Sequence, residues 1–183
     1  AKAGKWFERA FEFGNRDKKY DSAIEYYVQG LGFWPDAVEN GLKPLHGCAV
    51  AWRQSGGKKP GLKDTMKRSL TTKDPKDALL NALWLFGHDH DNLSYIEGML
   101  KNANRLHADD CLMWAANVYR KVLDDEKKPN AKRYLFLKEI LEETADRACA
   151  RLEVTLAIAT LEMGVQALTM LSHRVTKERE IDN

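Results

Sequence analysis

The residues His88, Asp89, His90 and Asp91 form the local cluster whose types and spacing best suit chemistry. Two histidines two positions apart, interleaved with carboxylates, offer nitrogen and oxygen ligands for zinc or another divalent ion. A protein metal site usually needs a further ligand, and His46 and His107 lie on other predicted helices. We therefore expect a solvated turn at 88–91. A metal-dependent enzyme or metal-binding protein built on this cluster is the alternative.

The other candidate catalytic groups have simpler explanations. The paired carboxylates at 109–110 and 124–126 fall at predicted helix ends, where acidic side chains are normally solvated. Ser172 and His173 are adjacent on a predicted helix, so they point to different faces and cannot form a nucleophile–base pair. The sequence contains no G-x-S-x-G, dinucleotide-binding fingerprint or H-E-x-x-H motif. We expect a non-enzyme that needs no cofactor.

A basic segment at 58–76 suggests a different class of function, the binding of an anionic surface or a nucleic acid. Only Asp64 and Asp74 offset its charge, and no aromatic side chain is present to stack on bases. The glycine-rich loop at 55–61 is no phosphate-binding loop, because no strand precedes it and no Ser or Thr follows its lysines in register. We expect a flexible, solvated insertion. Its basic residues are Lys58, Lys59, Lys63, Lys67, Arg68, Lys73 and Lys76.

Composition limits the remaining possibilities. The 183 residues are 44% hydrophobic and 31% charged, enough to bury a substantial core as one domain or as a short repeat array. The 29 basic and 27 acidic residues give a formal net charge of +2, without the concentrated basic excess of most nucleic-acid binders. We do not expect nucleic acid as a partner.

Localisation is predicted from what the sequence lacks. Cys48, Cys111 and Cys149 are odd in number and contain no C-x-x-C pair, which is typical of thiols in a reducing compartment. The first residues contain no apolar signal-peptide core, and we expect that no apolar run approaches the 18 or more residues of a membrane span. We therefore expect a cytoplasmic chain that does not contact a membrane.

Apolar residues recur at helical spacing along almost the whole chain. The first helix is expected over about 3–14, ending at Gly14-Asn15, and the second over about 20–31. Pro44 interrupts the next apolar face, which predicts either a kink near Gly41-Leu42 or a helix that restarts with Pro44 in its first turn. Further helices are expected from Asp74-Pro75 onward, from Leu93, and after the turn at 127–130.

The second of these helices carries a recognisable pattern. Ala23 and Tyr27 lie four residues apart on one helical face, and Pro35 follows eight residues later. This spacing resembles the A-x3-F…P pattern of the tetratricopeptide repeat, in which a small residue permits close helix packing and an aromatic fills the next turn. The first helix departs from the family, since Phe7 and Phe11 stand where it has Trp and Gly. The Gly-Gly-Lys-Lys and Lys-Asp-Pro-Lys segments resemble bacterial members.

The resemblance implies an all-α, right-handed superhelical stack of about four helix-turn-helix repeats, closed by a C-terminal capping helix. It covers roughly residues 3–175 and makes the whole chain, 1–183, a single domain. In the fourth repeat Ala145-Asp146 stands where the family has Gly-Asp. Gly164 is the one candidate break before the capping helix, and the alternative is a helix that runs on through it, because no proline is there. The expected bounds are repeat one 3–36, repeat two 37–92 with an insertion at 55–73, repeat three 93–126, repeat four 131–163 and capping helix 165–180.

The resemblance also implies a function, the binding of a protein or peptide on the concave surface formed by the first helix of each repeat. Family members that clamp the carboxylate tails of chaperones have Lys and Asn where Glu8 and Glu12 stand, so we do not expect a chaperone-tail partner. Acidic residues gather toward repeat four, which favours a basic ligand segment. The candidate partner-binding residues are Lys5, Glu8, Glu12, Arg16, Glu97, Lys101, Asn104, Arg105, Lys132, Glu139, Glu142 and Glu143.

Overall fold

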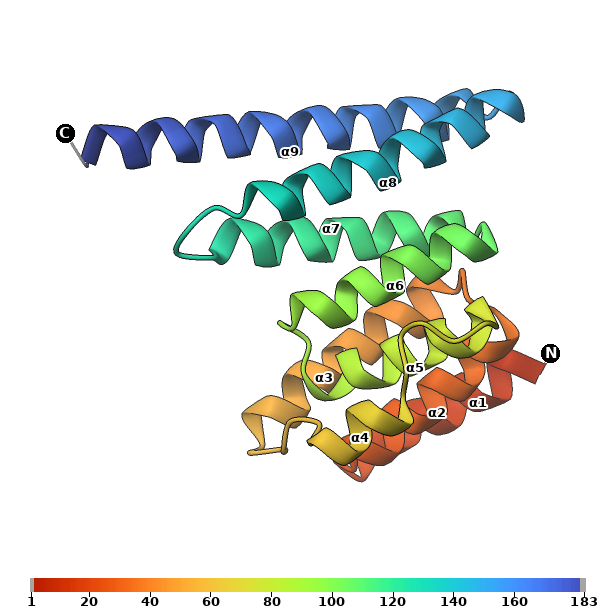
Figure 1. Cartoon of the computed structure of the whole chain (residues 1–183). Helices are drawn as coiled ribbons and strands as arrows, with labels where there is room; N and C mark the ends of the chain where they lie inside the picture. The colour runs from red at the N-terminus through yellow and green to blue at the C-terminus, as the bar shows by residue number, and fades with distance from the viewer. Residues whose placement is uncertain (1, 182–183) are drawn as a thin grey trace. The chain divides into compact units, whose positions relative to one another are not determined.

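This computed structural model describes the backbone of residues 2–181 and the side chains of residues 2–177. Over that backbone the chain has nine α-helices, two π-helical turns and no β-strand, which confirms the predicted all-α class (Figure 1). The chain divides into two compact units, Ala1–Ala115 and Ala116–Asn183. The elements are α1 Lys2–Phe11, η1 Glu12–Arg16, α2 Tyr20–Phe33, η2 Val38–Leu42, α3 Lys43–Gln54, α4 Leu62–Lys67, α5 Pro75–His88, α6 Leu93–Leu106, α7 Asp109–Asp125, α8 Ala131–Ala150 and α9 Val154–Ile181.

The core of the first unit forms where α2 packs on α1, α3 and α5, and where α5 packs on α3 and α6. Helix α2 buries the residues that its apolar periodicity predicts, including Ala23, Ile24, Tyr27 and Leu31. Ala23 has no exposed surface, and a Cβ placed on Gly14 would lie 3.4 Å from the Cβ of Ala23. The small side chain at 23 therefore permits a close contact between helices, as the repeat pattern predicts.

The predicted end of the first helix at Gly14-Asn15 is wrong. The helix continues through Gly14 as the π-helical turn η1 and ends before Lys18, whose φ of 55° is left-handed. Gly14 is buried, and a Cβ there would lie 3.0 Å from Cys48 Sγ. The glycine thus serves close packing against α3 and α2 instead of helix termination.

Pro44 lies in the first turn of α3, which confirms one of the two predicted arrangements. A proline is accommodated there because its missing N–H has no intrahelical partner in the first turn. The π-helical turn η2 leads directly into α3, with Leu42 as its last residue and as the N-cap of α3. Together η2 and α3 make one long wall of the first unit.

Helix caps fix the ends of α5 and α6. The Asp74 side chain accepts a hydrogen bond from the Lys76 N–H at 2.8 Å, and Pro75 begins α5, as predicted. The Asn92 side chain accepts from the Ser94 N–H at 3.1 Å, so α6 begins at Leu93. Each cap satisfies one backbone donor that the first helical turn leaves without an intrahelical acceptor.

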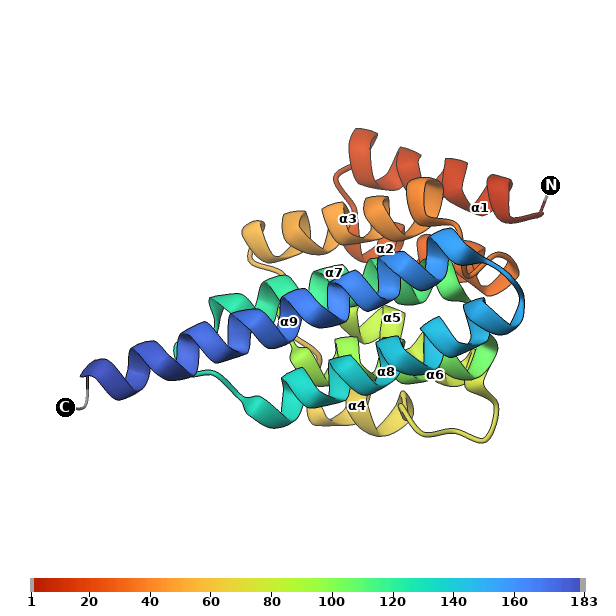
Figure 2. The same ribbon diagram turned by 90° about the horizontal axis from the view of Figure 1, so that it is seen from above.

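The second unit contains an antiparallel pair of long helices, α8 and α9, joined by a turn at 151–153 (Figure 2). The end of α7 is bound to them: the Tyr119 and Phe136 rings lie 6.0 Å apart, edge to face. Arg174 of α9 donates hydrogen bonds to the Leu123 carbonyl oxygen at 2.6 Å and to the Tyr134 hydroxyl at 3.2 Å. A side chain far along α9 therefore closes the C-terminal end of α7.

Two positions in this unit where a helix could end lie inside helices. Helix α8 runs through Ala145-Asp146 because Ala145 is a strong helix former that is buried in the packed face. The reversal comes instead at Leu152, which has a left-handed φ of 60°. Helix α9 continues through Gly164, which is the second of the two arrangements that the sequence left open, so no separate capping helix begins at 165. A glycine inside a helix costs only about 1 kcal/mol relative to alanine, too little to break a packed helix.

Helix α9 overturns the expectation that no part of the chain is apolar over the length of a membrane span. The stretch Val154–Lys177 has a mean hydropathy of 1.5 over its most apolar window, so it is long and apolar enough to cross a membrane by length and composition. The expectation that no apolar run approaches the length of a membrane span is therefore wrong, because Thr, Gln and Ser are scattered among the apolar residues of this stretch and mask its overall apolar character. About 28% of that window is buried within the protein.

Candidate functional site: a groove between α1–η1 and η2–α3

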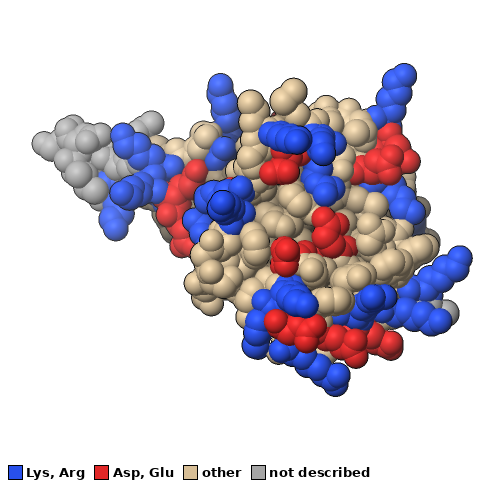
Figure 3. All heavy atoms as spheres, turned by 90° about the horizontal axis from the view of Figure 1, so that it is seen from below, with Lys and Arg blue, Asp and Glu red and all other residues tan. Residues whose placement is uncertain are grey.

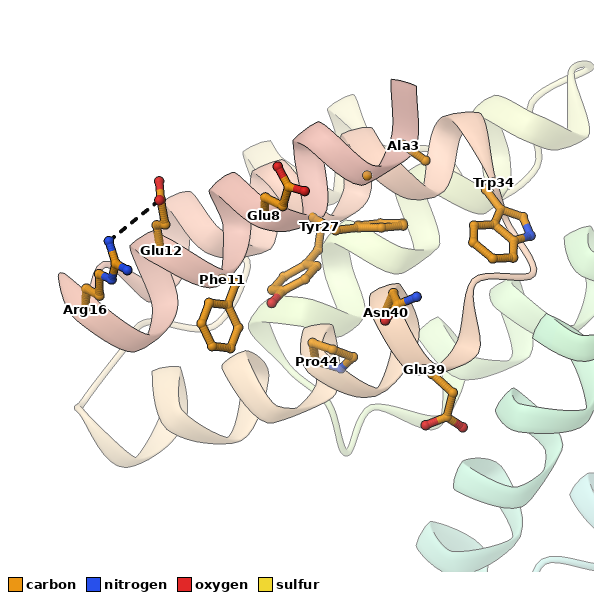
Figure 4. Close-up of a pocket in the computed structure, with 12 residues that line it drawn as sticks. Ala3, Glu8, Phe11, Glu12, Arg16, Tyr27, Trp34, Glu39, Asn40 and Pro44 are labelled. Carbon is orange, nitrogen blue, oxygen red and sulfur yellow. Dashed lines mark ion pairs between the residues drawn. The ribbon is translucent and has the colours of Figure 1, made fainter. Parts of the chain in front are cut away.

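An open groove with a volume of about 770 Å³ lies in the first unit. One wall is α1 with η1, the other is η2 with the start of α3, and Tyr27 of α2 lies at the base (Figure 4). The volume falls within the range of small-molecule and peptide side-chain sites. The lining residues are Ala3, Gly4, Phe7, Glu8, Phe11, Glu12, Arg16, Tyr27, Trp34, Glu39, Asn40 and Pro44.

The position of the α1 wall is set by Phe7. Its buried ring lies against two glycines that leave room for it: a Cβ on Gly30 would come 2.3 Å from the ring, and one on Gly41 would come 3.1 Å from it. The Phe7 and Tyr27 ring centroids are 6.3 Å apart. Because both glycines are needed for this fit, the sequence fixes how closely α1 approaches α2 and η2.

Two aromatic side chains in the groove are only half covered. Phe11 is 56% exposed and Trp34 is 50% exposed, although both are large and apolar. Figure 4 shows Phe11 and Trp34 toward opposite ends of the groove, with Tyr27 between them. An apolar ligand side chain that entered between them would bury aromatic surface that the isolated chain leaves in water.

The groove continues past Phe11 into a second recess of about 340 Å³. Phe11, Tyr27 and Pro44 line both spaces, and Cys48 contributes to the second. Burial raises the pKa of Tyr27 to about 12, with a smaller contribution from Cys48, and raises the pKa of Cys48 to about 11. Both groups are therefore neutral at pH 7, and the base of the groove is apolar in character.

The rim of the groove is mainly acidic. Glu12 pairs with Arg16 at 3.7 Å, and Glu39 pairs with Lys43 at 2.5 Å, both in exposed i,i+4 geometry. Glu8 forms no ion pair with any residue whose side chain the structure describes. Exposed pairs of this kind are weak and exchange partners readily. A basic ligand group would therefore find one uncommitted carboxylate and two that are only loosely held.

Both walls contain a π-helical turn, η1 on one side and η2 on the other. Such turns are rare and cost hydrogen-bond quality, and they recur at functional sites where they re-aim side chains. Here η1 carries Glu12 and Arg16 to the rim, and η2 carries Glu39 and Asn40 to the opposite rim. The wider turns thus present the polar side chains that border the groove.

The groove gathers Glu8, Glu12 and Arg16, three of the predicted partner-binding residues, while exposed Lys5 lies on α1 outside its lining. Those predicted in repeat three, Glu97, Lys101, Asn104 and Arg105, lie on α6. The Arg105 guanidinium donates to the Lys73 carbonyl oxygen at 2.9 Å and so holds the segment before α5. The last four, Lys132, Glu139, Glu142 and Glu143, lie on α8, where Glu142 pairs with Lys138 at 2.7 Å.

The turn at 88–91 is not the solvated turn that the sequence suggests. Asp89 is 5% exposed, and its carboxylate lies 2.9 Å from Lys59 Nζ and 3.7 Å from Arg53 Nη1. Burial lowers the pKa of His88, whose ring lies 4.0 Å from that of Trp84. Among the described side chains, no group of three or more His, Cys, Asp and Glu is placed to hold a metal ion. The cluster ties the end of α3 to the end of α5.

The basic segment is also more ordered than a free insertion. Lys59 is paired with Asp89, the Lys58 carbonyl oxygen accepts a hydrogen bond from Trp52 Nε1 at 3.1 Å, and the Arg68 guanidinium lies 3.8 Å from the Trp84 ring centroid. These contacts anchor the loop to α3 and α5. On the face drawn in Figure 3, basic and acidic side chains are interspersed and do not form one broad basic patch.

Sequence reasoning missed most of the groove's apolar lining. The spacing of Phe11 from Phe7 and Ala10 is typical of a buried helix face, yet Phe11 is more than half exposed. Trp34 carried a usable signal, because a Trp directly before Pro35 is expected in a partly exposed turn. Glu39 and Asn40 carried none, since only the fold brings η2 opposite α1.

Comparison with family models, with curated proteins and with solved structures finds no match for this chain.

Proposed function

We propose that this chain is a non-enzymatic scaffold that binds a peptide segment of another protein in the groove between α1–η1 and η2–α3. The observation that carries the proposal is the pair of half-exposed aromatic side chains, Phe11 and Trp34, in one recess with an acidic rim. Exposed aromatic surface of this kind in a concave site is typical of an anchor for a partner's apolar side chain.

The proposed architecture is a tetratricopeptide-like stack. Its support is local: Ala23, Tyr27 and Pro35 match the repeat pattern, and Ala23 lies at a helix–helix contact. In that architecture α1 and η2–α3 are the first helices of successive repeats, which line the concave surface. The groove then occupies the place where the family binds its peptide partners, in a chain that needs no cofactor and works in the cytoplasm.

The rim chemistry narrows the peptide class to a basic one. Glu8, Glu12 and Glu39 border the groove against a single basic side chain, Arg16. A segment with one apolar or aromatic residue flanked by Lys or Arg would place its apolar group between Phe11 and Trp34 and its charges beside the glutamates. The chaperone-tail class is disfavoured, because its carboxylates would meet the same glutamates.

The test uses two synthetic peptides with the same Leu-Phe centre, one flanked by lysines and the other by glutamates, titrated by fluorescence anisotropy. The Lys-flanked peptide is expected to bind and the Glu-flanked peptide is not. The triple variant Glu8→Lys, Glu12→Lys and Glu39→Lys is expected to reverse that preference. Circular dichroism before each titration establishes that the variant is folded.

The matched control carries the same three charge reversals on α8, at Glu139, Glu142 and Glu143. If the groove is the recognition site, this variant binds the Lys-flanked peptide like the wild type. Loss of binding in the α8 variant with full binding in the groove variant would transfer the recognition site to α8. Equal binding of both peptides by every variant would refute charge selection and with it the proposed peptide class.

A further inference from the structure

Helix α9 leaves a continuous apolar stripe in water. Val154 is 63% exposed, Ile158 and Leu161 are each 50% exposed, and Val165 is 65% exposed. They follow one another at spacings of four, three and four residues, so they share one face of the helix. Leu168 continues the stripe, half-buried beside α8. We call this stripe, with Ser172 and Val175 that extend it, the open seam.

Helix α9 packs on α8 through a different set of residues. Ala157, Thr160, Gly164 and Ala167 are buried, and each lies one position before a residue of the open seam. Consecutive helical residues are about 100° apart around the axis. The Thr160 hydroxyl donates to the Ala157 carbonyl oxygen at 2.8 Å, so the packed face has no unsatisfied hydroxyl there. Packing on α8 therefore leaves the open seam without a partner in this unit.

The order of residue types along the open seam selects the kind of partner. The alternation of three and four residues assigns Ile158, Val165 and Ser172 to heptad position a, and Val154, Leu161, Leu168 and Val175 to position d. β-Branched residues at a with leucine at d favour two parallel helices. From Val154 to Val175 the seam is about 32 Å long, close to three heptads, at 1.5 Å per residue.

From these features we propose that the open seam is a homodimer interface, in which α9 of a second copy packs parallel and in register to form a two-stranded coiled coil. The occupant is argued from charge. Glu162 is the one charged residue that α9 carries in the positions that flank the seam between Thr155 and Thr176, and in this register the position opposite it holds the buried, uncharged Ala157. Lys138 and Glu142 of α8, which border the seam beside Leu161 and Val165, pair with each other at 2.7 Å. No like charges meet, so two identical seams are compatible.

Ser172 strengthens the assignment of register. In the parallel arrangement the two Ser172 side chains face each other at one a layer and can exchange a hydrogen bond. In an antiparallel pair each hydroxyl would face an apolar d residue without a partner. A single polar a residue is a known determinant of register and orientation in coiled coils.

The shape of the exposed apolar surface favours a helix over a lipid bilayer. A membrane-spanning helix meets hydrocarbon around its whole circumference, whereas the exposed surface of α9 includes Thr155, Glu162, Gln166 and Thr169 beside the seam. A charge in the hydrocarbon is costly, and Glu162 falls near the middle of the stretch. The apolar stripe is narrow enough for one neighbouring helix to cover.

The first experiment measures the oligomeric state of the full chain by analytical ultracentrifugation at tens of micromolar. We expect twice the mass of one chain for the wild type, and the mass of one chain for Leu161→Glu with Val165→Glu. The control, Gln166→Glu with His173→Glu, adds the same charge at exposed positions outside the seam and is expected to dimerise like the wild type. A monomeric wild type, or a folded seam variant that still dimerises, overturns the proposal.

A second measurement reads register without a destabilising change. In a Cys149→Ser background, Ser172→Cys is expected to form an intermolecular disulfide under mild oxidation, and Gln166→Cys is not. Equal cross-linking of both, or none at Ser172→Cys, overturns the parallel dimer. Flotation with neutral phosphatidylcholine vesicles tests whether a lipid bilayer covers the seam instead. The chain is expected in the vesicle-free fraction. A monomer that floats with the vesicles overturns the proposal in favour of a membrane.

Discussion

Two of the apolar surfaces that the described residues expose, the groove of the first unit and the open seam of α9, differ in shape, residue type and charge. The groove is a recess with aromatic side chains, an acidic rim and neutral Tyr27 at its base, and it adjoins a second recess lined by the neutral Cys48. The seam is a row of mainly aliphatic side chains, beside which α9 places one charge, Glu162, and α8 the mutually paired Lys138 and Glu142. Exposure alone therefore does not identify a partner. Aromatic groups in a charged recess suit a short segment of a different protein, whereas an uncharged heptad stripe suits another helix of the same kind.

The strongest test of the groove's construction is Gly30→Ala. A Cβ at this position would lie 2.3 Å from the buried Phe7 ring, so α1 must shift away from α2. Overpacking of this kind costs about 1–3 kcal/mol of unfolding free energy, and the shift should also abolish peptide binding. Gly47→Ala on α3 is the control, because a Cβ there meets nothing within 4 Å. Equal thermal midpoints for the two variants would show that Phe7 does not set the wall.

The next effect concerns the contact that holds the α3 wall to α5. Asp89→Asn removes a buried carboxylate from Lys59 and Arg53, which should cost about 1–3 kcal/mol of unfolding free energy. Asp91→Asn removes the exposed partner of the same arginine and should cost at most about 1 kcal/mol. Urea denaturation of both variants measures the difference. If Asp91→Asn lowered the unfolding free energy more than Asp89→Asn, the segment 88–91 would be a solvated turn, as the sequence suggested.

Salt should separate the two surfaces. Binding of the Lys-flanked peptide relies on exposed carboxylates, each contributing about 0–1 kcal/mol, so it should weaken several-fold between low and high salt. The dimer of α9 buries uncharged side chains and should hold or tighten over the same range. Anisotropy and ultracentrifugation in one salt series measure both. The comparison fails if the dimer weakens with salt and peptide binding does not.

The smallest effect is on alkaline stability. The neutral thiol of Cys48 is favoured in the folded chain, where its pKa is raised to about 11, whereas an unfolded cysteine ionises near 9. The unfolded chain therefore releases its proton first, and stability falls as the pH rises from about 9 toward 11. Cys48→Ala should flatten that part of the profile in thermal melts. An unchanged slope would mean that the thiol is not buried in the recess beside the groove.

The sequence predicted the features that depend on local rules. The all-α class, the helix starts at Pro75 and Leu93 and the close contact at Ala23 follow from periodicity, capping side chains and residue size. The errors arose where packing overrides those rules. Gly14 is helix-compatible once neighbouring helices fix the backbone, so the first helix does not end there.

The candidate site was only partly predictable. Glu8, Glu12 and Arg16 could be placed on one exposed helix face by spacing, and the groove includes them. The opposite rim at Glu39 and Asn40 could not, because its position depends on how Phe7 fits between Gly30 and Gly41. The same limit applies to Asp89, whose burial depends on Lys59 and Arg53 arriving from a distant loop and helix.

The most direct test of the peptide-binding groove is a titration of the Lys-flanked peptide into three single variants, Phe11→Ala, Trp34→Ala and Phe33→Ala. Phe33 is 54% exposed, as much as the other two, but does not line the groove. Loss of an aromatic anchor in Phe11→Ala or Trp34→Ala should cost about 1–2 kcal/mol of binding free energy, which raises the dissociation constant about five- to thirtyfold. Phe33→Ala should leave the dissociation constant unchanged. Equal affinities for all three folded variants and the wild type would contradict the groove as the binding site.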